Sequence, residues 1–378
     1  MKSLFILHES KFVYGANRSL TELLKNIDYD FDILICKSFT KKIDEHGIRE
    51  LLGKHLKRIY ICWLPRYRCF SFDKLSVISE LSHYVNNFMA LIYSRQRKRI
   101  IRQGNYDYVH LNSVVLFPVI DDNAVYIMHI REIINLAYHN IKKISQRLRK
   151  AGGIICIDEV TENALKKIFP EERAIVLNNP FSMLGLKNVN YEENLRKYRL
   201  GEENTVFAML GQVTESKGAK FVIQAFMKQH NEKSRLLIVG NHNHSYGKEC
   251  EEMAQSDKRI IFCGELKDTT GIYRISDYII RGDAQFCIGR TIFEGLYAGC
   301  GVIIPGGSDD LQSFPEGKKF EEKIIFYPPE NESALSDVIE VQAGIKQIDR
   351  TLHSNVDDYV DKYNQYIKKT IGVHEGQS

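Results

Sequence analysis

The chain lacks the motifs that mark several large classes of enzyme. Its 378 residues contain no Walker loop, no GxGxxG fingerprint and no Ser/His/Asp triad pattern. Enzymes of the P-loop, NAD-dependent and serine hydrolase classes therefore have no support. No apolar run approaches the roughly 18 residues that a membrane-spanning helix requires. Residues 1–8 turn polar too soon for a signal peptide and are typical of a first strand, so we expect a cytoplasmic protein.

The cysteine pattern excludes a second group of functions. The chain has eight cysteines, with no CxxC pair and no spacing typical of a metal site. Most of them lie in apolar, strand-like segments, which favours reduced residues inside a hydrophobic core. The sequence predicts no metal ligands. The cysteines are Cys36, Cys62, Cys69, Cys156, Cys250, Cys263, Cys287 and Cys300.

The sequence does contain a repeated alternation of strand and helix signals. Short apolar segments alternate with helical segments through residues 3–177, and the alternation restarts at residue 205. Repeated strand–helix units predict parallel sheets covered on both faces, with ligand sites at the carboxyl ends of the strands. The length fits two domains. We expect an α/β fold with domains at 1–182 and 183–355, and a helix at about 356–372 that crosses back onto the first domain.

The charge of the chain is unevenly distributed. Residues 1–182 hold 28 Lys and Arg against 19 Asp and Glu, whereas the remainder holds 24 against 29. A basic first half predicts contact with an anionic membrane surface, although its clusters at 95–102 and 142–150 are equally consistent with solvated helix faces. Nucleic acid is less favoured, because no binding motif accompanies the charge. The first cluster ends the helical segment at 73–104, and its basic residues are Arg95, Arg97, Lys98, Arg99 and Arg102.

Residues 287–304 read as a loop, a helix, a glycine-rich break and a short buried strand. Gly289 allows a close backbone approach, and Thr291 is the candidate N-cap of the helix. Unpaired amides and a partial positive charge at a helix start favour an anion. Glu294 is expected on the first helical turn, where it suits the dipole or holds a hydroxyl group of a ligand. The alternative is a capped structural helix.

Polar residues follow the expected strands of the first half. A lone glycine turn or a lone histidine at such a position is usually structural. A His, an Arg and a Glu together at the carboxyl end of one strand are more typical of a ligand site. The residues are Gly15, Ala16 and Arg18 after the first strand, Asn112 and Ser113 after a later one, and His129, Arg131 and Glu132 after the next.

Strand ends of the second half carry further candidates. Residues 211–218 follow a strand and open a helix, and Lys217 with the helix amides would suit a diphosphate. The alternative is an exposed lysine at the end of a loop. Backbone groups near Gly264 and Glu265 could recognise a flat base, and Asp283 follows the next strand.

The order of these motifs resembles the GT-B fold glycosyltransferases of family 4, the retaining, nucleotide-sugar-dependent enzymes also called group 1 glycosyltransferases. The resemblance spans nearly the whole chain. Each motif is weak alone, and their common order and near-family spacing carry the resemblance. It implies two facing Rossmann-like domains, of which the second holds most of the donor. The matching segments are 15–20, 109–113, 129–132, 176–181, 211–218, 236–240, 262–264 and 289–295.

The resemblance also implies roles for single residues. Lys217 matches the family's phosphate-binding lysine, Glu294 its ribose-binding glutamate and His129 the histidine beside the donor sugar, so these three are the expected catalytic residues. Fixed cationic and amide donors would stabilise the leaving diphosphate without a metal or other cofactor. The other expected donor contacts are Gly15, Ala16, Gln212, Gly264, Glu265, Gly289, Arg290 and Thr291. The sugar and acceptor side would comprise Arg18, Asn112, Ser113, Arg131, Glu132 and Asp283.

Two positions depart from the family pattern. The family usually has two glutamates separated by seven residues, and Phe286 stands where the first is expected. Asp283 or Gln285 could supply a polar group there, although neither is in register. The family often has an arginine where Gln212 stands, and Arg290 is the candidate substitute for that cation.

These features predict a retaining hexosyltransferase. It would move a hexose or N-acetylhexosamine from a nucleotide sugar, UDP before GDP, to a lipid-linked or surface-polysaccharide acceptor such as an O-antigen, lipopolysaccharide or capsule precursor. A lipid-linked acceptor would place the protein peripherally at the inner face of the plasma membrane. Two alternatives are a nucleotide-sugar 2-epimerase of the same fold and a non-catalytic, nucleotide-binding partner protein, which the missing glutamate favours.

Overall fold

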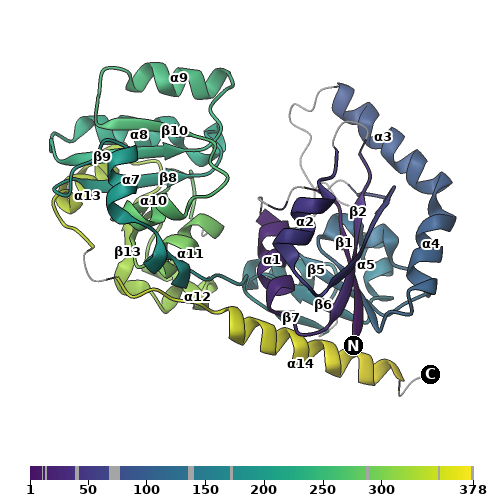
Figure 1. The fold of residues 1–378 in the computed structure, drawn as a ribbon. Coiled ribbons are helices and arrows are strands. Elements are labelled where there is room, and N and C mark those ends of the chain that lie inside the picture. Colours follow the sequence, from purple (N-terminus) through teal and green to yellow (C-terminus); the bar gives the residue numbers. More distant parts are fainter. Residues whose placement is uncertain are drawn as a thin grey trace. The chain divides into compact units, whose positions relative to one another are not determined.

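The structure is a computed structural model that describes residues 1–10, 12, 15–38, 42–67, 77–134, 140–170, 173–286, 289–347 and 350–375. The chain divides into two compact units, Met1–Pro180 with Val356–Ser378, and Phe181–Asn355 (Figure 1). The sequence predicts that the first domain ends at residue 182, and in the structure the first unit ends at Pro180. Cys69, Cys287 and Ile288, which belong to segments considered above, lie outside the described residues.

The two sheets share one strand order. In the first unit seven strands lie in the order β3-β2-β1-β4-β5-β6-β7, and in the second six lie in the order β10-β9-β8-β11-β12-β13. All of these pairings are parallel, so the predicted α/β class is confirmed. The order reverses between β1 and β4 and between β8 and β11. Open sheets of this kind bind ligands at the carboxyl ends of the strands beside such a switch point.

The strand bounds agree closely with the apolar segments of the sequence. In the first unit the strands are β1 (Lys2–Leu7), β2 (Asp30–Cys36), β3 (Leu56–Cys62), β4 (Tyr108–Leu111), β5 (Tyr126–Ile130), β6 (Gly153–Cys156) and β7 (Ala174–Val176). In the second they are β8 (Thr205–Leu210), β9 (Ser234–Val239), β10 (Ile260–Gly264), β11 (Tyr278–Ile280), β12 (Gly301–Pro305) and β13 (Ile324–Tyr327).

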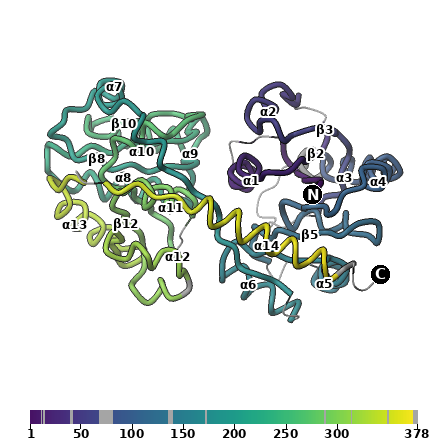
Figure 2. Tube along the Cα trace, turned by 60° about the horizontal axis from the view of Figure 1, so that its bottom comes forward, coloured from purple at the N-terminus to yellow at the C-terminus, as the bar shows by residue number. Residues whose placement is uncertain are grey.

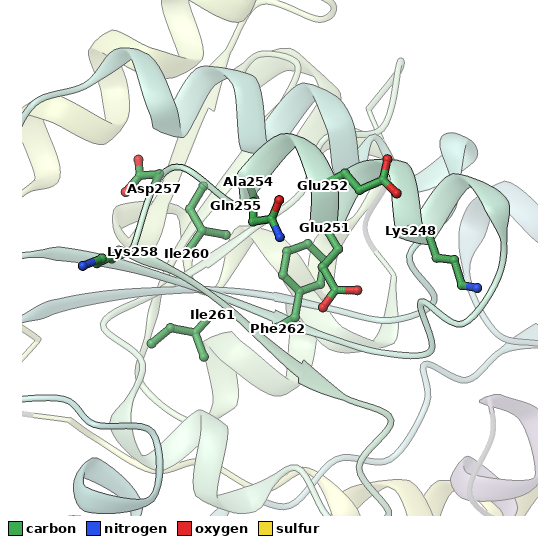
Figure 3. A pocket seen from close by; sticks show the side chains of 10 residues that line it. All are labelled: Lys248, Glu251, Glu252, Ala254, Gln255, Asp257, Lys258, Ile260, Ile261 and Phe262. Atoms are coloured by element: carbon green, nitrogen blue, oxygen red, sulfur yellow. The ribbon is translucent and has the colours of Figure 1, made fainter.

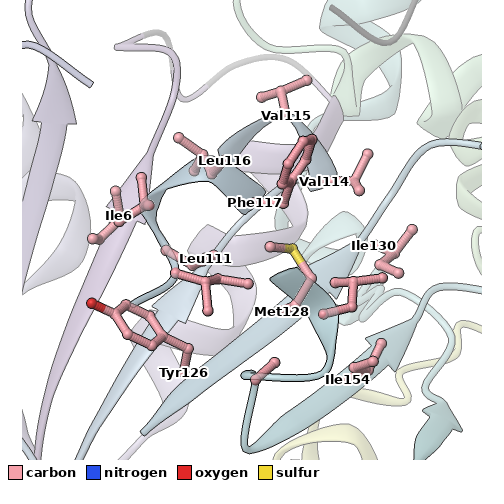
Figure 4. Packing of buried hydrophobic residues seen from close by; sticks show 14 of the residues in the cluster. Ile6, Leu111, Val114, Val115, Leu116, Phe117, Tyr126, Met128, Ile130 and Ile154 are labelled. Atoms are coloured by element: carbon pink, nitrogen blue, oxygen red, sulfur yellow. The ribbon is translucent and has the colours of Figure 1, made fainter. Parts of the chain in front are cut away.

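Helices cover both faces of the first sheet. One face packs against α1, α2 and α14, and the other against η1, α4, α5 and α6. Figure 4 shows part of the second cluster, in which side chains of η1 such as Leu116 and Phe117 gather with Leu111 and Met128 of the sheet. Tyr359 and Tyr363 of α14 are fully buried in the core of the first unit, so the final helix returns to this unit as predicted (Figure 2). The bounds are α1 (Gly15–Asn26), α2 (Glu45–Leu52), α3 (Val77–Ile92), α4 (Ser94–Gln103), η1 (Val114–Val119), α5 (Ile141–Leu148), α6 (Glu159–Lys166) and α14 (Val356–Glu375).

The second sheet is also covered on both faces. Helices α7, α10 and α11 contribute to the core on one face, and α8, α9 and α13 to the core on the other. The bounds are η2 (Leu184–Asn188), α7 (Tyr191–Lys197), η3 (Glu215–Lys217), α8 (Ala219–Lys228), α9 (Ser245–Ala254), α10 (Thr270–Ile275), α11 (Arg290–Tyr297), η4 (Ser308–Ser313), α12 (Pro315–Lys318), η5 (Glu321–Lys323) and α13 (Glu332–Gln342).

Of the helical segment expected at 73–104, residues 73–76 lie outside the described residues, and the rest forms two helices, α3 and α4, which meet at Tyr93. Among the described helices, none combines the length and the apolar character needed to cross a membrane.

The described cysteines are free thiols, and all except the half-buried Cys263 are buried. Burial raises the pKa of Cys156 and of Cys263 to about 12. Both groups are therefore protonated at neutral pH, as expected of cysteines that pack as apolar side chains.

Candidate active site

The loops that follow β8 and β11 meet at the switch point of the second sheet. Gly218 ends the first loop with a φ of +66°. A Cβ atom at Gly218 would collide with the carbonyl group of Gly282 in the second loop. Because glycine has no Cβ, the two backbones can approach this closely. The contact holds Lys217 of the first loop close to Asp283 of the second.

Asp283 lies between two cations. Its carboxylate accepts hydrogen bonds from Arg281, with Nε at 2.7 Å from Oδ2 and Nη2 at 2.8 Å from Oδ1. Lys217 Nζ lies 3.4 Å from the same Oδ1. Arg281 is only 4% exposed, whereas the Lys217 side chain is 40% exposed. The arginine is thus held rigidly by a two-point ion pair, and the lysine is free to reach a ligand.

The guanidinium group of Arg281 also lies against the start of α11. Its Nη1 is 3.3 Å from Oγ1 of Thr291, and a Cβ atom at Gly289 would lie 3.2 Å from the same nitrogen. Gly289 is the N-cap residue and makes no side-chain cap. The prediction that Thr291 caps this helix is wrong, because α11 already begins at Arg290. The helix start instead presents backbone amides beside a buried cation, which is an anion-binding arrangement.

Glu294 lies inside α11 and not on its first turn, so that prediction is also wrong. The side chain is buried, and both of its oxygens are engaged. Oε1 accepts from Arg290 Nε at 2.8 Å, and Oε2 accepts from the hydroxyl group of Tyr273 at 2.7 Å. The Arg290 guanidinium also stacks on the ring of Phe181, 4.9 Å from its centroid. Of the two arginines near α11, Arg281 shares a partner with Lys217, whereas Arg290 is paired with Glu294.

Arg281 is the main candidate that the sequence reasoning did not include. It could have been included from sequence, because it is a charged residue directly after the apolar strand β11. Ligand-binding residues are expected at such a switch point. Its partners in the second loop and in α11 depend on the folded chain.

Phe286, at the position of the missing glutamate, has an apolar environment. Its ring packs edge-on against Phe314, with centroids 5.3 Å apart, and lies 6.5 Å from the ring of Phe326. A Cβ atom at Gly306 would contact the Phe286 ring at 2.9 Å. The substitution therefore completes an aromatic cluster next to β12 and β13.

The remaining donor candidates of the second unit lie at the same edge of the sheet. Gln212 and Glu265 are exposed, directly after β8 and β10. Gly264 has a φ of +73° and accepts a hydrogen bond from the Gly240 amide at 2.9 Å. These positions are accessible, and their contacts with a donor stay predictions.

In the first unit, a polar network occupies the switch point between β1 and β4. Asn112 donates to Oδ1 of Asn17 at 3.1 Å and to the carbonyl oxygen of Ala16 at 3.3 Å. Arg131 donates to Oδ1 of Asn112 at 2.7 Å and to Oδ1 of Asn179 at 2.8 Å. The network joins the start of α1, where Gly15 has a φ of +33°, to the ends of β4 and β5. Asn17 and Asn179 were not among the predicted site residues.

Glu132 and Ser113 form a structural pair. Ser113 Oγ donates to Oε1 of Glu132 at 2.5 Å, and the amide of Val114 donates to Oε2 at 3.1 Å. Ser113 also accepts from the Val115 amide and so caps η1. Arg18 is half-buried on α1. Glu132 thus accepts hydrogen bonds at the start of η1. The expected contact of Glu132 with the acceptor stays a prediction.

Two histidines lie beneath this network. His110 and His129 are fully buried, with ring centroids 5.3 Å apart. His110 Nδ1 lies 2.8 Å from the hydroxyl group of Tyr363, and His129 Nδ1 lies 3.4 Å from Arg131 Nη2. The Nε2 atoms of both have no hydrogen-bond partner among the described residues. Burial, followed by the Arg131 charge, lowers the pKa of each well below its ordinary value, so both are neutral at pH 7.

A surface pocket of about 580 Å³ lies between α9 and β10 (Figure 3). Its lining includes Glu251, Lys258 and Phe262, and it shares no residue with the two switch-point loops of the second unit.

Residues 204–341 match the family model described as Glycosyl transferases group 1. This segment contains Lys217, Arg281, Asp283 and all of α11. It is a group 1 glycosyltransferase domain. The predicted enzyme class, a glycosyltransferase, is therefore confirmed. No curated protein sequence matches the chain.

Solved structures extend the likeness to the whole chain. The Anabaena protein Alr3699/HepE, in complex with UDP and glucose, has a TM-score of 0.70 at 14% identity, covering 97% of this chain and 99% of that one. A glycosyltransferase from Rickettsia africae has a TM-score of 0.69 at 16% identity, covering 98% of each. WaaG, involved in lipopolysaccharide biosynthesis, has a TM-score of 0.59 at 11% identity, covering 98% and 95%. The predicted GT-B fold of this glycosyltransferase is confirmed.

The buried histidines predict a loss of stability in mild acid. Their pKa values are lowered in the folded chain, so between those values and about 6.5 the unfolded chain binds more protons. Stability is full above pH 6.5 and falls below it, by up to about 1.4 kcal/mol per pH unit for each histidine. Urea unfolding of the first unit, followed through the buried Trp63, should show this fall between pH 7 and pH 5. His129→Gln should make it shallower, and the exposed His46→Gln should not. Equal slopes for the wild type and His129→Gln would contradict this assignment.

Proposed function

We propose that the protein is a retaining hexosyltransferase whose nucleotide-sugar donor binds at the switch point of the group 1 domain. The observation that carries the proposal is the pair of cations, Lys217 and Arg281, that share Asp283 at the start of α11. Two cations beside the start of a helix suit a diphosphate.

Two of the similar solved structures favour a particular donor and a particular class of acceptor. The Anabaena relative was solved with UDP and glucose, which favours a UDP-hexose donor over a GDP-sugar. WaaG acts in lipopolysaccharide biosynthesis, which favours a lipid-linked or surface-polysaccharide acceptor. A lipid-linked acceptor would bring the protein to the inner face of the plasma membrane.

In the proposed reaction, the bond between the sugar C1 and the diphosphate oxygen breaks. A bond from C1 to the acceptor hydroxyl oxygen forms on the same face of the ring, and the hydroxyl proton passes to the departing phosphate oxygen. Negative charge builds on the diphosphate as it leaves. Lys217, Arg281 and the first amides of α11 would stabilise that charge without a metal, because they are already in place before the reaction.

Asp283 holds Arg281 more firmly than it holds Lys217. Its two-point bond keeps Arg281 in one orientation. The contact with Lys217 is single and 3.4 Å long, so the lysine can exchange the carboxylate for a phosphate oxygen at little cost. On this proposal Asp283 positions the phosphate-binding groups and does not contact the sugar.

Lys217→Ala should weaken UDP binding roughly tenfold to a hundredfold, because hydrogen bonds to charged groups contribute about 1.5–3 kcal/mol. Thermal unfolding with increasing UDP measures this, since a ligand of the folded state raises its stability. Lys220→Ala is the matched control, because this nearby lysine pairs with Glu249 on the surface of α8 and α9. Equal UDP affinity for Lys217→Ala and Lys220→Ala would contradict the proposed phosphate site.

The role of Arg281 is tested by removing the whole ion pair. Arg281→Gln with Asp283→Asn leaves no single buried charge, so the fold should persist while UDP affinity falls about tenfold or more. The same chain offers a control in Arg259 and Asp257, a two-point pair with the same spacing.

Arg259→Gln with Asp257→Asn should leave UDP affinity unchanged. The assignment of Arg281 is wrong if both double variants bind UDP as the wild type does. A common loss in both variants would indicate a general effect on the second unit.

Incubation with UDP-GlcNAc in the absence of an acceptor distinguishes a 2-epimerase from a transferase. An epimerase would form a new nucleotide sugar, whereas a transferase would leave the donor unchanged apart from slow hydrolysis. The environment of Phe286 is the observation that favours the non-catalytic alternative. UDP binding without turnover across a panel of glycan acceptors would support that alternative.

A further inference from the structure

Helix α3 turns an apolar face to solvent. Six large apolar side chains on it are between 36% and 71% exposed. Their spacing of three, four and seven residues places them in one stripe along the helix. Figure 1 shows α3 and α4 at the periphery of the first unit. The apolar stripe consists of Leu81, Tyr84, Val85, Phe88, Leu91 and Ile92.

The opposite face of α3 is polar, and it is the face that packs on the unit. Asn86 is 2% exposed and donates to the carbonyl oxygen of Leu64 at 2.9 Å. Asn87 accepts from the amide of Arg66 at 2.8 Å and donates to its carbonyl oxygen at 3.0 Å. These bonds fix the rotation of the helix about its axis. Turning the apolar stripe inward would leave buried polar groups of both partners unpaired.

Helix α4 places cations directly after this stripe. Arg95, Lys98, Arg99 and Arg102 are exposed, and no acidic residue occurs anywhere in 81–106.

Arg97, which the sequence prediction included in this cationic surface, does not belong to it. It is 8% exposed and donates to the carbonyl oxygen of Ala90 at 3.2 Å. Its role is to join the two helices, because it lies on α4 and its partner lies on α3.

An exposed apolar stripe on one helix marks a surface that a membrane or another protein molecule covers. The charge of α4 distinguishes between a second copy of this chain and a bilayer. In a two-fold dimer this surface would meet an identical copy of itself, and residues 81–106 contain no acidic residue that could pair with the cations of α4. A bilayer with anionic headgroups satisfies both features, because acyl chains accept the apolar stripe and lipid phosphates accept the cations. With 16 residues, α3 is shorter than the roughly 20 that span a bilayer, so it would lie in the plane of the interface.

We propose that α3 inserts its apolar stripe into the surface of an anionic bilayer while α4 contacts the lipid phosphates. This deepens the proposed function by naming the partner that would present a lipid-linked acceptor. Membrane binding is nevertheless independent of donor and transfer. Lys217→Ala, which weakens the donor site, should bind vesicles as the wild type does.

The test is co-sedimentation of the full chain with vesicles of phosphatidylcholine, with or without phosphatidylglycerol. The wild type should bind the anionic vesicles, and part of this binding should resist high salt. Arg95→Gln with Lys98→Gln and Arg99→Gln should weaken binding roughly a hundredfold at low salt, since each cation near a membrane contributes about 1 kcal/mol.

Phe88→Glu with Leu91→Glu should abolish the salt-resistant part of the binding. The control is Val341→Glu, which changes a comparably exposed apolar residue of the second unit and should have no effect. In Phe88→Trp, lipids brominated near the headgroup should quench the new fluorescence, whereas the buried Trp63 should not respond.

Failure of the wild type to bind anionic vesicles would overturn the proposal, as would equal binding by Phe88→Glu with Leu91→Glu. A dimer in solution that dissociates in this variant would identify a second copy as the occupant and would also overturn it.

Discussion

The carboxylate of Asp283 is the constraint on which the candidate donor site depends. A buried arginine in an α/β domain needs a fixed counter-charge, and Asp283 supplies it with two hydrogen bonds to Arg281. The same carboxylate lies near Lys217, so one acidic group orients two cations from neighbouring loops. The glycine contact between these loops, at Gly218 and Gly282, makes the arrangement sterically possible.

On the proposed function, this ion pair would replace the arginine that the family often has at the position of Gln212. The second cation would then come from the end of β11 and not from the loop after β8. It reaches the start of α11 beside Thr291. Arg290, the substitute expected from sequence, is instead paired with Glu294 and stacked on Phe181.

Much of the fold could be predicted from sequence because it depends on local pattern. The strand segments, the two α/β units and the returning helix α14 follow from apolar periodicity and the restart at residue 205. Helix α11 begins two residues earlier than predicted, and this shift was enough to move Glu294 out of the first turn. The pairing of Arg281, the aromatic cluster around Phe286 and the outward face of α3 could not be predicted. Each depends on contacts between segments far apart in the chain, such as Asn86 with Leu64.

The proposed donor site requires that a nucleotide diphosphate binds where the β8 and β11 loops meet the start of α11. Hydrogen–deuterium exchange with and without UDP can detect this binding at the backbone amides themselves. Peptides covering 211–218 and 289–294 should exchange more slowly when UDP is bound. Protection confined to the pocket between α9 and β10, at 248–262, with no change in those two peptides, would contradict it.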